Sequence, residues 1–165
     1  MGIFDWLLGA KKPNADYETV ALVLLGHTED RGKRPYGVDV VGESNYQDAL
    51  WRAVGERSPK GARRHYVTAV LRPEPDNKYD PNAIAVHAVT PTGALKVGYL
   101  SRRLAEEYHA DFVALRARGY ETGACDAVII GGFRDEEGDV ASLGIRLNLG
   151  RPGSILPPPD EASDA

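Results

Sequence analysis

The sequence predicts a mainly β fold of the α+β kind, in which a small barrel or curled antiparallel sheet carries two helices. Three observations support this expectation. About seven short runs rich in β-branched and other apolar residues are spread along the chain. Glycine, proline and asparagine separate these runs with strong turn signals. Two segments show the three-and-four spacing of apolar residues that indicates an amphipathic helix.

The expected strands follow one another with clear boundaries. The first ends at Gly26, and the second alternates Tyr36, Val38 and Val40 before it stops at Gly42. A long polar turn at 73–81 contains three prolines and separates the third strand from the fourth. The full set of expected strands is 19–25, 36–41, 65–71, 83–89, 95–100, 127–130 and 143–149.

The two expected helices have recognisable ends. The first begins at Ser44, which forms a capping box with Gln47, three residues further on. The second starts after Ser101, and Gly119 follows its last turn as a C-terminal cap. Its apolar face is made of Leu104, Ala105, Tyr108, Phe112 and Leu115.

Length and composition indicate one globular domain. The chain has 165 residues, of which 42% are hydrophobic and 27% charged. We expect an apolar stub and linker at 1–16, a β domain at 17–150, and a flexible, proline-rich acidic tail at 151–165.

Several classes of protein are excluded or disfavoured. A single cysteine, Cys125, rules out an internal disulfide framework and a multi-cysteine zinc site. The four histidines show no ligand spacing, and no motif of nucleophilic or nucleotide-dependent catalysis is present. No apolar run approaches the roughly 20 residues that a membrane span needs. We therefore expect a cytoplasmic protein that is not an enzyme and needs no cofactor or metal.

The charge pattern argues against a purely electrostatic grip on nucleic acid. The net charge is −4, and the acidic residues of 134–165 account for it, so the rest of the chain is neutral. One basic cluster stands out: Arg57, Lys60, Arg63, Arg64 and His65. It is either a phosphate-binding surface or a solvated loop.

The stretch 72–86 is the most distinctive part of the sequence. Asn77 and Asp80 are residue types that hydrogen-bond their own backbone, so one interpretation is that they only build the turn. The other is that the Tyr79 ring stacks on a nucleic-acid base and that Asp80 accepts a hydrogen bond from a ligand hydroxyl.

Three blocks of the chain, 40–46, 74–86 and 97–101, resemble a HIRAN domain in order and spacing. The resemblance covers residues 36–133. It implies a six-stranded OB- or SH3-like barrel with two helices, and a pocket for the 3′ end of single-stranded DNA. In such a pocket Tyr79 stacks on the terminal base, Asp80 accepts the 3′-hydroxyl, Asn77 lines the wall, and Tyr99 and Arg102 approach the strand.

The block after Gly42 differs from that of DNA-end-binding members, which carry an arginine and two consecutive tyrosines. Ser44, Asn45 and Tyr46 stand there in this chain, and Tyr46 either stacks on DNA or packs in the core. Together, the resemblance and the basic cluster give the candidate DNA-binding residues: Tyr79, Asp80, Asn77, Tyr46, Asn45, Tyr99, Arg102, Arg63, Arg64 and Phe133.

The expected function is a DNA-binding module for single-stranded DNA or 3′-hydroxyl DNA ends, in DNA repair or replication-fork processing. A helicase-like ATPase or another repair protein is the expected protein partner. Two alternatives remain. One is a protein-interaction adaptor with a vestigial DNA pocket. The other is a magnesium-dependent nuclease built on Asp76, Lys78 and Asp80, although no further acid stands out as a metal ligand.

Overall fold

The computed structural model describes residues 21–27, 35–55, 64–132, 137 and 142–159. Seven strands and three α-helices lie in these ranges, together with one short 3₁₀ turn. The strands are β1 (Leu22–Val23), β2 (Val38–Asp39), β3 (His65–Pro73), β4 (Ile84–Thr90), β5 (Gly93–Tyr99), β6 (Gly123–Gly131) and β7 (Leu143–Asn148). The helical elements are η3 (Glu43–Asn45), α2 (Gln47–Val54), α3 (Arg102–Glu107) and α4 (His109–Ala117).

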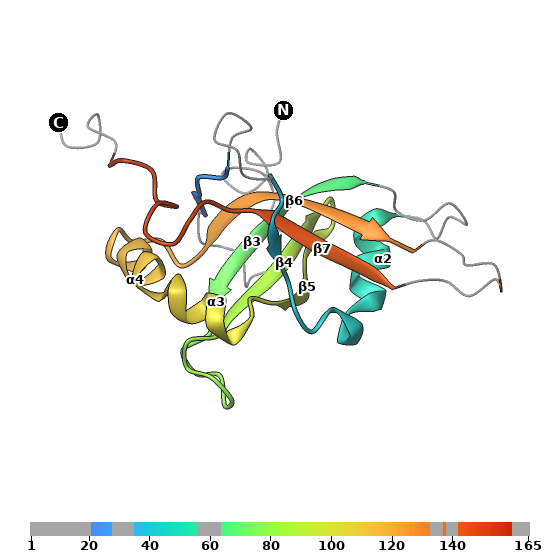
Figure 1. Ribbon diagram of the computed structural model, residues 1–165, viewed down its shortest axis with the longest axis horizontal. Helices are drawn as coiled ribbons and strands as arrows, with labels where there is room; N and C mark the ends of the chain where they lie inside the picture. The colour runs from blue at the N-terminus through green and yellow to red at the C-terminus, as the bar shows by residue number, and fades with distance from the viewer. Residues whose placement is uncertain (1–20, 28–34, 56–63, 133–136, 138–141, 160–165) are drawn as a thin grey trace.

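The strands form one mainly antiparallel sheet in the order β2-β7-β6-β3-β4-β5, and β1 adds to β6 in parallel. The sheet curls so that its two edges approach each other (Figure 1). Val41, two residues after β2, exchanges two backbone hydrogen bonds of 2.8 and 2.9 Å with Tyr99 at the end of β5. This single bridge joins the edges, but no continuous strand ladder closes the sheet.

The mainly β prediction is therefore confirmed, whereas a closed six-stranded barrel with two helices is not. Seven paired strands lie in the described residues, and the sheet is open. The second predicted helix is split in two at Tyr108, whose hydroxyl donates to the carbonyl oxygen of Gly150 over 2.6 Å. The first of these helices starts after Ser101 as predicted, and the Ser101 hydroxyl caps it by accepting from the amide of Leu104.

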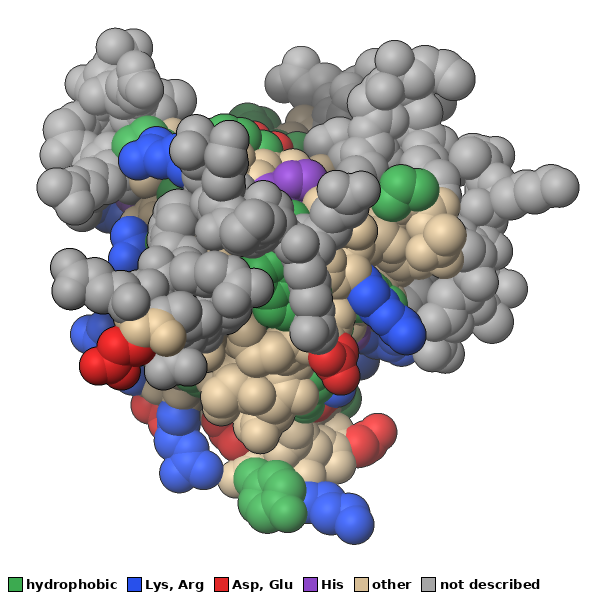
Figure 2. All heavy atoms as spheres, turned by 90° about the vertical axis from the view of Figure 1, so that its right-hand side faces the viewer, with side chains coloured by type: hydrophobic (Ala, Val, Ile, Leu, Met, Phe, Trp, Pro, Cys, Tyr) green, Lys and Arg blue, Asp and Glu red, His purple; other side chains and the backbone are tan. Residues whose placement is uncertain are grey.

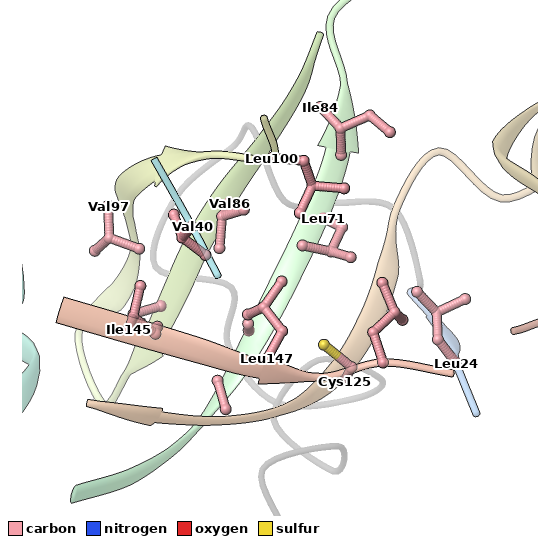
Figure 3. Packing of buried hydrophobic residues seen from close by; sticks show 14 of the residues in the cluster. Leu24, Val40, Leu71, Ile84, Val86, Val97, Leu100, Cys125, Ile145 and Leu147 are labelled. Atoms are coloured by element: carbon pink, nitrogen blue, oxygen red, sulfur yellow. The ribbon is translucent and has the colours of Figure 1, made fainter. Parts of the chain in front are cut away.

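The hydrophobic core fills the concave side of the curled sheet. Alternate residues of each strand point inward, and Leu71, Val86, Val97, Ile145 and Leu147 are all fully buried there (Figure 3). Each such side chain contributes about 1.5–3 kcal/mol when it leaves water. The core thus fixes the strands whose ends carry the candidate site.

The predicted capping box at Ser44 is wrong. Ser44 lies inside η3, and α2 begins only at Gln47 without a side-chain cap. Instead, Nε2 of the Gln47 side chain donates to the carbonyl oxygen of Leu143 over 2.9 Å, and its Oε1 accepts from the backbone N–H of Leu143 over 2.9 Å. A long-range contact to β7 therefore replaces the local cap that the spacing predicts.

The first part of the predicted C-terminal tail packs against the domain. Ile155 is fully buried in the core, and its carbonyl oxygen accepts from the amide of Leu25 over 2.8 Å. Arg118 donates to the carbonyl oxygen of Pro157 over 2.6 Å. The predicted stub at 1–16 lies outside the described residues.

Candidate nucleic-acid interface

The loop that joins β3 to β4, residues 74–83, projects from the body below α3 (Figure 1). Its two ends are closed by the Glu74 amide, which donates to the carbonyl oxygen of Ala83 over 2.8 Å. In the space-filling view, the lower end of the molecule carries a hydrophobic side chain with a lysine or arginine beside it (Figure 2). A hydrophobic group and a positive charge thus lie side by side at this end of the molecule.

Asn77 shapes the tip of this loop. Its Oδ1 accepts from the backbone amides of Tyr79 and Asp80 over 2.9 and 3.1 Å, and its Nδ2 donates to Oε1 of Glu74 over 3.1 Å. A side-chain oxygen that accepts from amides two and three residues on holds a tight turn. Asn77 therefore fixes the backbone from which Tyr79 and Asp80 project.

Tyr79 is 87% exposed, the largest exposure among the described large hydrophobic residues. A ring of this size in water contributes nothing to the core, although its backbone is held on both sides. The Tyr79 amide bonds to Asn77, and its carbonyl oxygen accepts from Nη2 of Arg102 over 3.1 Å. The fold thus holds the backbone in place and leaves the ring free to stack.

Asp80 belongs to the loop and faces Arg102 at the start of α3. Its Oδ1 accepts from the Asn82 amide over 2.9 Å, and its Oδ2 lies 3.8 Å from Nε of Arg102. The Asp80 side chain is 18% exposed and that of Arg102 is 69% exposed. A loose, solvated ion pair of this kind is weak, about 0–1 kcal/mol. Oδ2 of Asp80 can therefore accept from a further donor at little cost to this pair.

Three side chains lock the base of the loop. Nζ of Lys96 donates to Oε2 of Glu74 over 2.7 Å and to the Tyr99 hydroxyl over 3.1 Å, and that hydroxyl donates to Oε1 of Glu74 over 3.0 Å. Burial alone would raise the pKa of Glu74, but the bonds from Lys96, Asn77 and Tyr99 outweigh it and lower that pKa. Burial likewise opposes the charge on Lys96, yet Glu74 and Tyr99 raise the pKa of the ammonium.

A cavity of about 590 Å³ opens beside this cluster, on the convex side of β3 and β4. Arg72, Glu74, Asn77, His87 and Lys96 are among the residues that line it. Burial, with the nearby Lys96 charge, lowers the pKa of His87 to about 4, so its imidazole is neutral near pH 7. His87 is thus a buried residue of β4.

The other predicted site residues are not brought to this loop by any bond in the described structure. The amides of Asn45 and Tyr46 donate within their own turn, to the carbonyl oxygens of Gly42 and Glu43. Arg64 precedes β3, whereas the loop follows it. Since β3 has nine residues, these two places are roughly 25 Å apart along the strand. Arg63 and Phe133 lie outside the described residues.

Comparison with known protein families identifies this architecture. Residues 41–110 match the family model of the HIRAN domain. The chain contains a HIRAN domain. HIRAN domains are a DNA-binding family, and the matched segment includes the whole β3–β4 loop and the start of α3. Neither the curated proteins nor the solved structures gave a match to the chain.

The HIRAN segment holds two groups that the sequence did not single out, Glu74 and Lys96. They lie 22 residues apart, and nothing local pairs them. Among the described residues, no group of three or more histidine, cysteine or acidic side chains is placed to hold a metal ion. No described helix is long and apolar enough to cross a membrane.

Proposed function

We propose that this HIRAN domain captures the 3′-hydroxyl end of single-stranded DNA, in DNA repair or replication-fork processing. Any strand-processing chemistry would come from a partner such as a helicase-like ATPase, and the domain itself would only bind. The observation that carries the proposal is the pairing of an 87% exposed Tyr79 ring with a backbone held by Asn77 and Arg102. Such a ring stacks on any base, which is worth about 1–3 kcal/mol.

Asp80 supplies the discrimination between DNA ends. Each carboxylate oxygen offers two lone pairs, and Oδ2 of Asp80 faces Arg102 at 3.8 Å rather than a close donor. A terminal hydroxyl can donate to this oxygen, whereas a terminal phosphate would place negative charge against it. Arg102 lies on the same side and would hold the phosphate that precedes the terminal nucleotide.

The test compares short labelled strands that end in a 3′-hydroxyl or a 3′-phosphate, by fluorescence anisotropy. The same strands are titrated with Asp80→Asn. This variant removes the charge of residue 80 but keeps an oxygen that can accept from the Asn82 amide. The wild type should prefer the hydroxyl end, and Asp80→Asn should lose most of that preference without losing the fold. Equal binding of both ends by the wild type would refute end recognition. Absence of binding at low salt would favour the adaptor interpretation.

A further inference from the structure

A second hollow lies at the far end of β3 from the Tyr79 loop, and the proposed end recognition does not use it. Its volume is about 700 Å³, and its lining includes Tyr36, Tyr66, Arg64, Arg146 and Asp39. These residues come from β2, β3, β7 and the segments just before β2 and β3. The rest of the lining consists of Pro35, Gly37, Val128 and Ile130.

The register of the sheet builds the floor of this hollow. Tyr66 pairs with Val128, Val128 with Arg146, and Arg146 with Asp39, so one transverse row crosses β3, β6, β7 and β2. Neighbouring strands are about 4.8 Å apart, so the row is roughly 14 Å long. The residues adjacent to this row in each strand point into the core, which places the row on the convex face.

The aromatic part of the hollow is fixed yet open. The rings of Tyr36 and Tyr66 meet edge to face, with centroids 5.6 Å apart and an interplanar angle of 62°. Tyr36 adopts a φ of +60°, a left-handed conformation that costs a non-glycine residue of order 1 kcal/mol. Tyr66 nevertheless remains 56% exposed. The Tyr36 ring thus packs against the Tyr66 ring, and the Tyr66 ring stays exposed to water. An exposed ring held in this way can stack on a base.

The charges around the rings are balanced rather than strongly basic. Arg146 pairs with Asp39 over 3.3 Å, and Asp126 is close enough to Tyr36 to contribute to its raised pKa, behind the effect of burial. Arg64 is exposed at the rim. Stacking should therefore supply more of the affinity here than phosphate contacts do.

We infer that the Tyr36–Tyr66 hollow is a second binding site, which stacks an internal base of single-stranded DNA on Tyr66 and places Arg64 beside the backbone. This goes beyond the capture of a terminus, because a site roughly 25 Å along β3 from the Tyr79 loop needs no free end. Aromatic side chains on which bases stack, with an arginine beside the backbone, are a usual way in which proteins hold single strands without reading sequence.

A closed circle of single-stranded DNA, labelled internally, tests this site because it has no 3′ end. In anisotropy titrations at low salt, Tyr66→Ala should weaken binding of the circle at least about fivefold. Tyr66→Phe should retain the affinity, since it keeps the ring. Val113→Ala, a matched loss of an exposed hydrophobic side chain on α4 outside both proposed sites, should change the affinity for the circle less than twofold. Equal binding by wild type and Tyr66→Ala, or no binding of the circle, would overturn the inference.

Further titrations separate a loss of base stacking from a folding defect, and separate this second site from the proposed 3′-end site at Tyr79 and Asp80. A circle with several abasic positions keeps its phosphates but offers fewer bases, and the wild type should bind it more weakly by a similar factor. A circle of RNA that binds where the DNA circle does not would overturn the assignment to DNA. On short linear strands, Tyr66→Ala should keep the preference for a 3′-hydroxyl, whereas Asp80→Asn should lose it while still binding the circle. The two proposals can thus fail separately.

Discussion

Nζ of Lys96 lies 2.7 Å from Oε2 of Glu74 and joins β5 to the root of the loop that carries Tyr79. The same carboxylate accepts from Asn77, which shapes the loop tip, and from Tyr99, whose backbone bridges to Val41. One acidic side chain therefore connects the joined edges of the curled sheet to the candidate DNA-binding loop. The order of this loop should depend on the charge of Glu74.

Replacement of Glu74 should loosen the loop and lower stability together. Glu74→Gln keeps the size of the side chain but removes its charge, and both partners are a quarter to a third exposed, so we expect a loss of about 1 kcal/mol. Because the folded pKa of Glu74 is lowered, its contribution is present above the unfolded value near 4.5 and is lost as pH falls through the folded value. In thermal melting, the advantage of the wild type over Glu74→Gln should be complete at pH 7 and should shrink as the pH is lowered below 4.5. An advantage that does not change over this range would contradict the linkage.

His87 should make the domain sensitive to mild acid. Its folded pKa, lowered by burial to about 4 from 6.5, favours the neutral form, so its contribution is complete above pH 6.5 and decreases as pH falls toward 4. The cumulative cost by pH 4 is about 3 kcal/mol. Imidazole signals followed by NMR should show one histidine that titrates near pH 4, and urea unfolding should show a steep loss of stability over the same range. A His87 signal that titrates near 6.5 would exclude this source of acid sensitivity.

Arg102 should contribute one phosphate contact to the binding of a DNA end. Arg102→Ala should flatten the dependence of log K on log salt by about 0.7, the value for one phosphate of a single strand. The neighbouring Arg103→Ala is the matched control, because its side chain is 80% exposed and pairs with Glu107, one helical turn away. Anisotropy titrations from 50 to 200 mM salt measure both slopes. If the slope of log K against log salt is similar for Arg102→Ala and Arg103→Ala, Arg102 does not contact a phosphate.

Gly98 should be required for the bridge between the sheet edges. A Cβ at this position would lie 2.5 Å from Cγ1 of Val40 and 2.6 Å from the carbonyl oxygen of Val41, which belongs to the bridge itself. Gly98→Ala should therefore destabilise the fold by about 1–3 kcal/mol. Gly153→Ala is the control, since it has a positive φ but meets nothing within 4 Å. Chemical denaturation of both variants separates the clash from the backbone preference, and equal losses would argue against the clash.

Local pattern was enough to locate most of the strands, because side-chain alternation and turn residues depend only on neighbouring positions, although the run predicted at 127–130 misses the first four residues of β6. The runs predicted at 65–71, 83–89 and 143–149 correspond to β3, β4 and β7 within about two residues at each end. The turn at Asn77 was equally readable, since its bonds reach only two or three residues along the chain.

The same local reasoning failed where a distant partner competed for a side chain. Gln47 was assigned to a capping box with Ser44, but its amide bonds to Leu143 on β7. The backbone N–H and carbonyl of Leu143 both bond to the side-chain amide of Gln47. The spacing of residues within the helix cannot reveal these two bonds. At Tyr108, likewise, the hydroxyl binds the distant carbonyl oxygen of Gly150, a contact that spacing along the helix does not reveal.

The sequence by itself therefore determined the mainly β class, the strand positions and the loop that carries Asn77, Tyr79 and Asp80. Only the tertiary structure decided that Glu74 and Lys96 brace that loop, that Arg64 lies at the other end of β3, and that Tyr66 shares a row with Arg146. The reason is physical. Period and turn chemistry are properties of neighbouring residues, whereas register and sheet curvature depend on how the whole core packs.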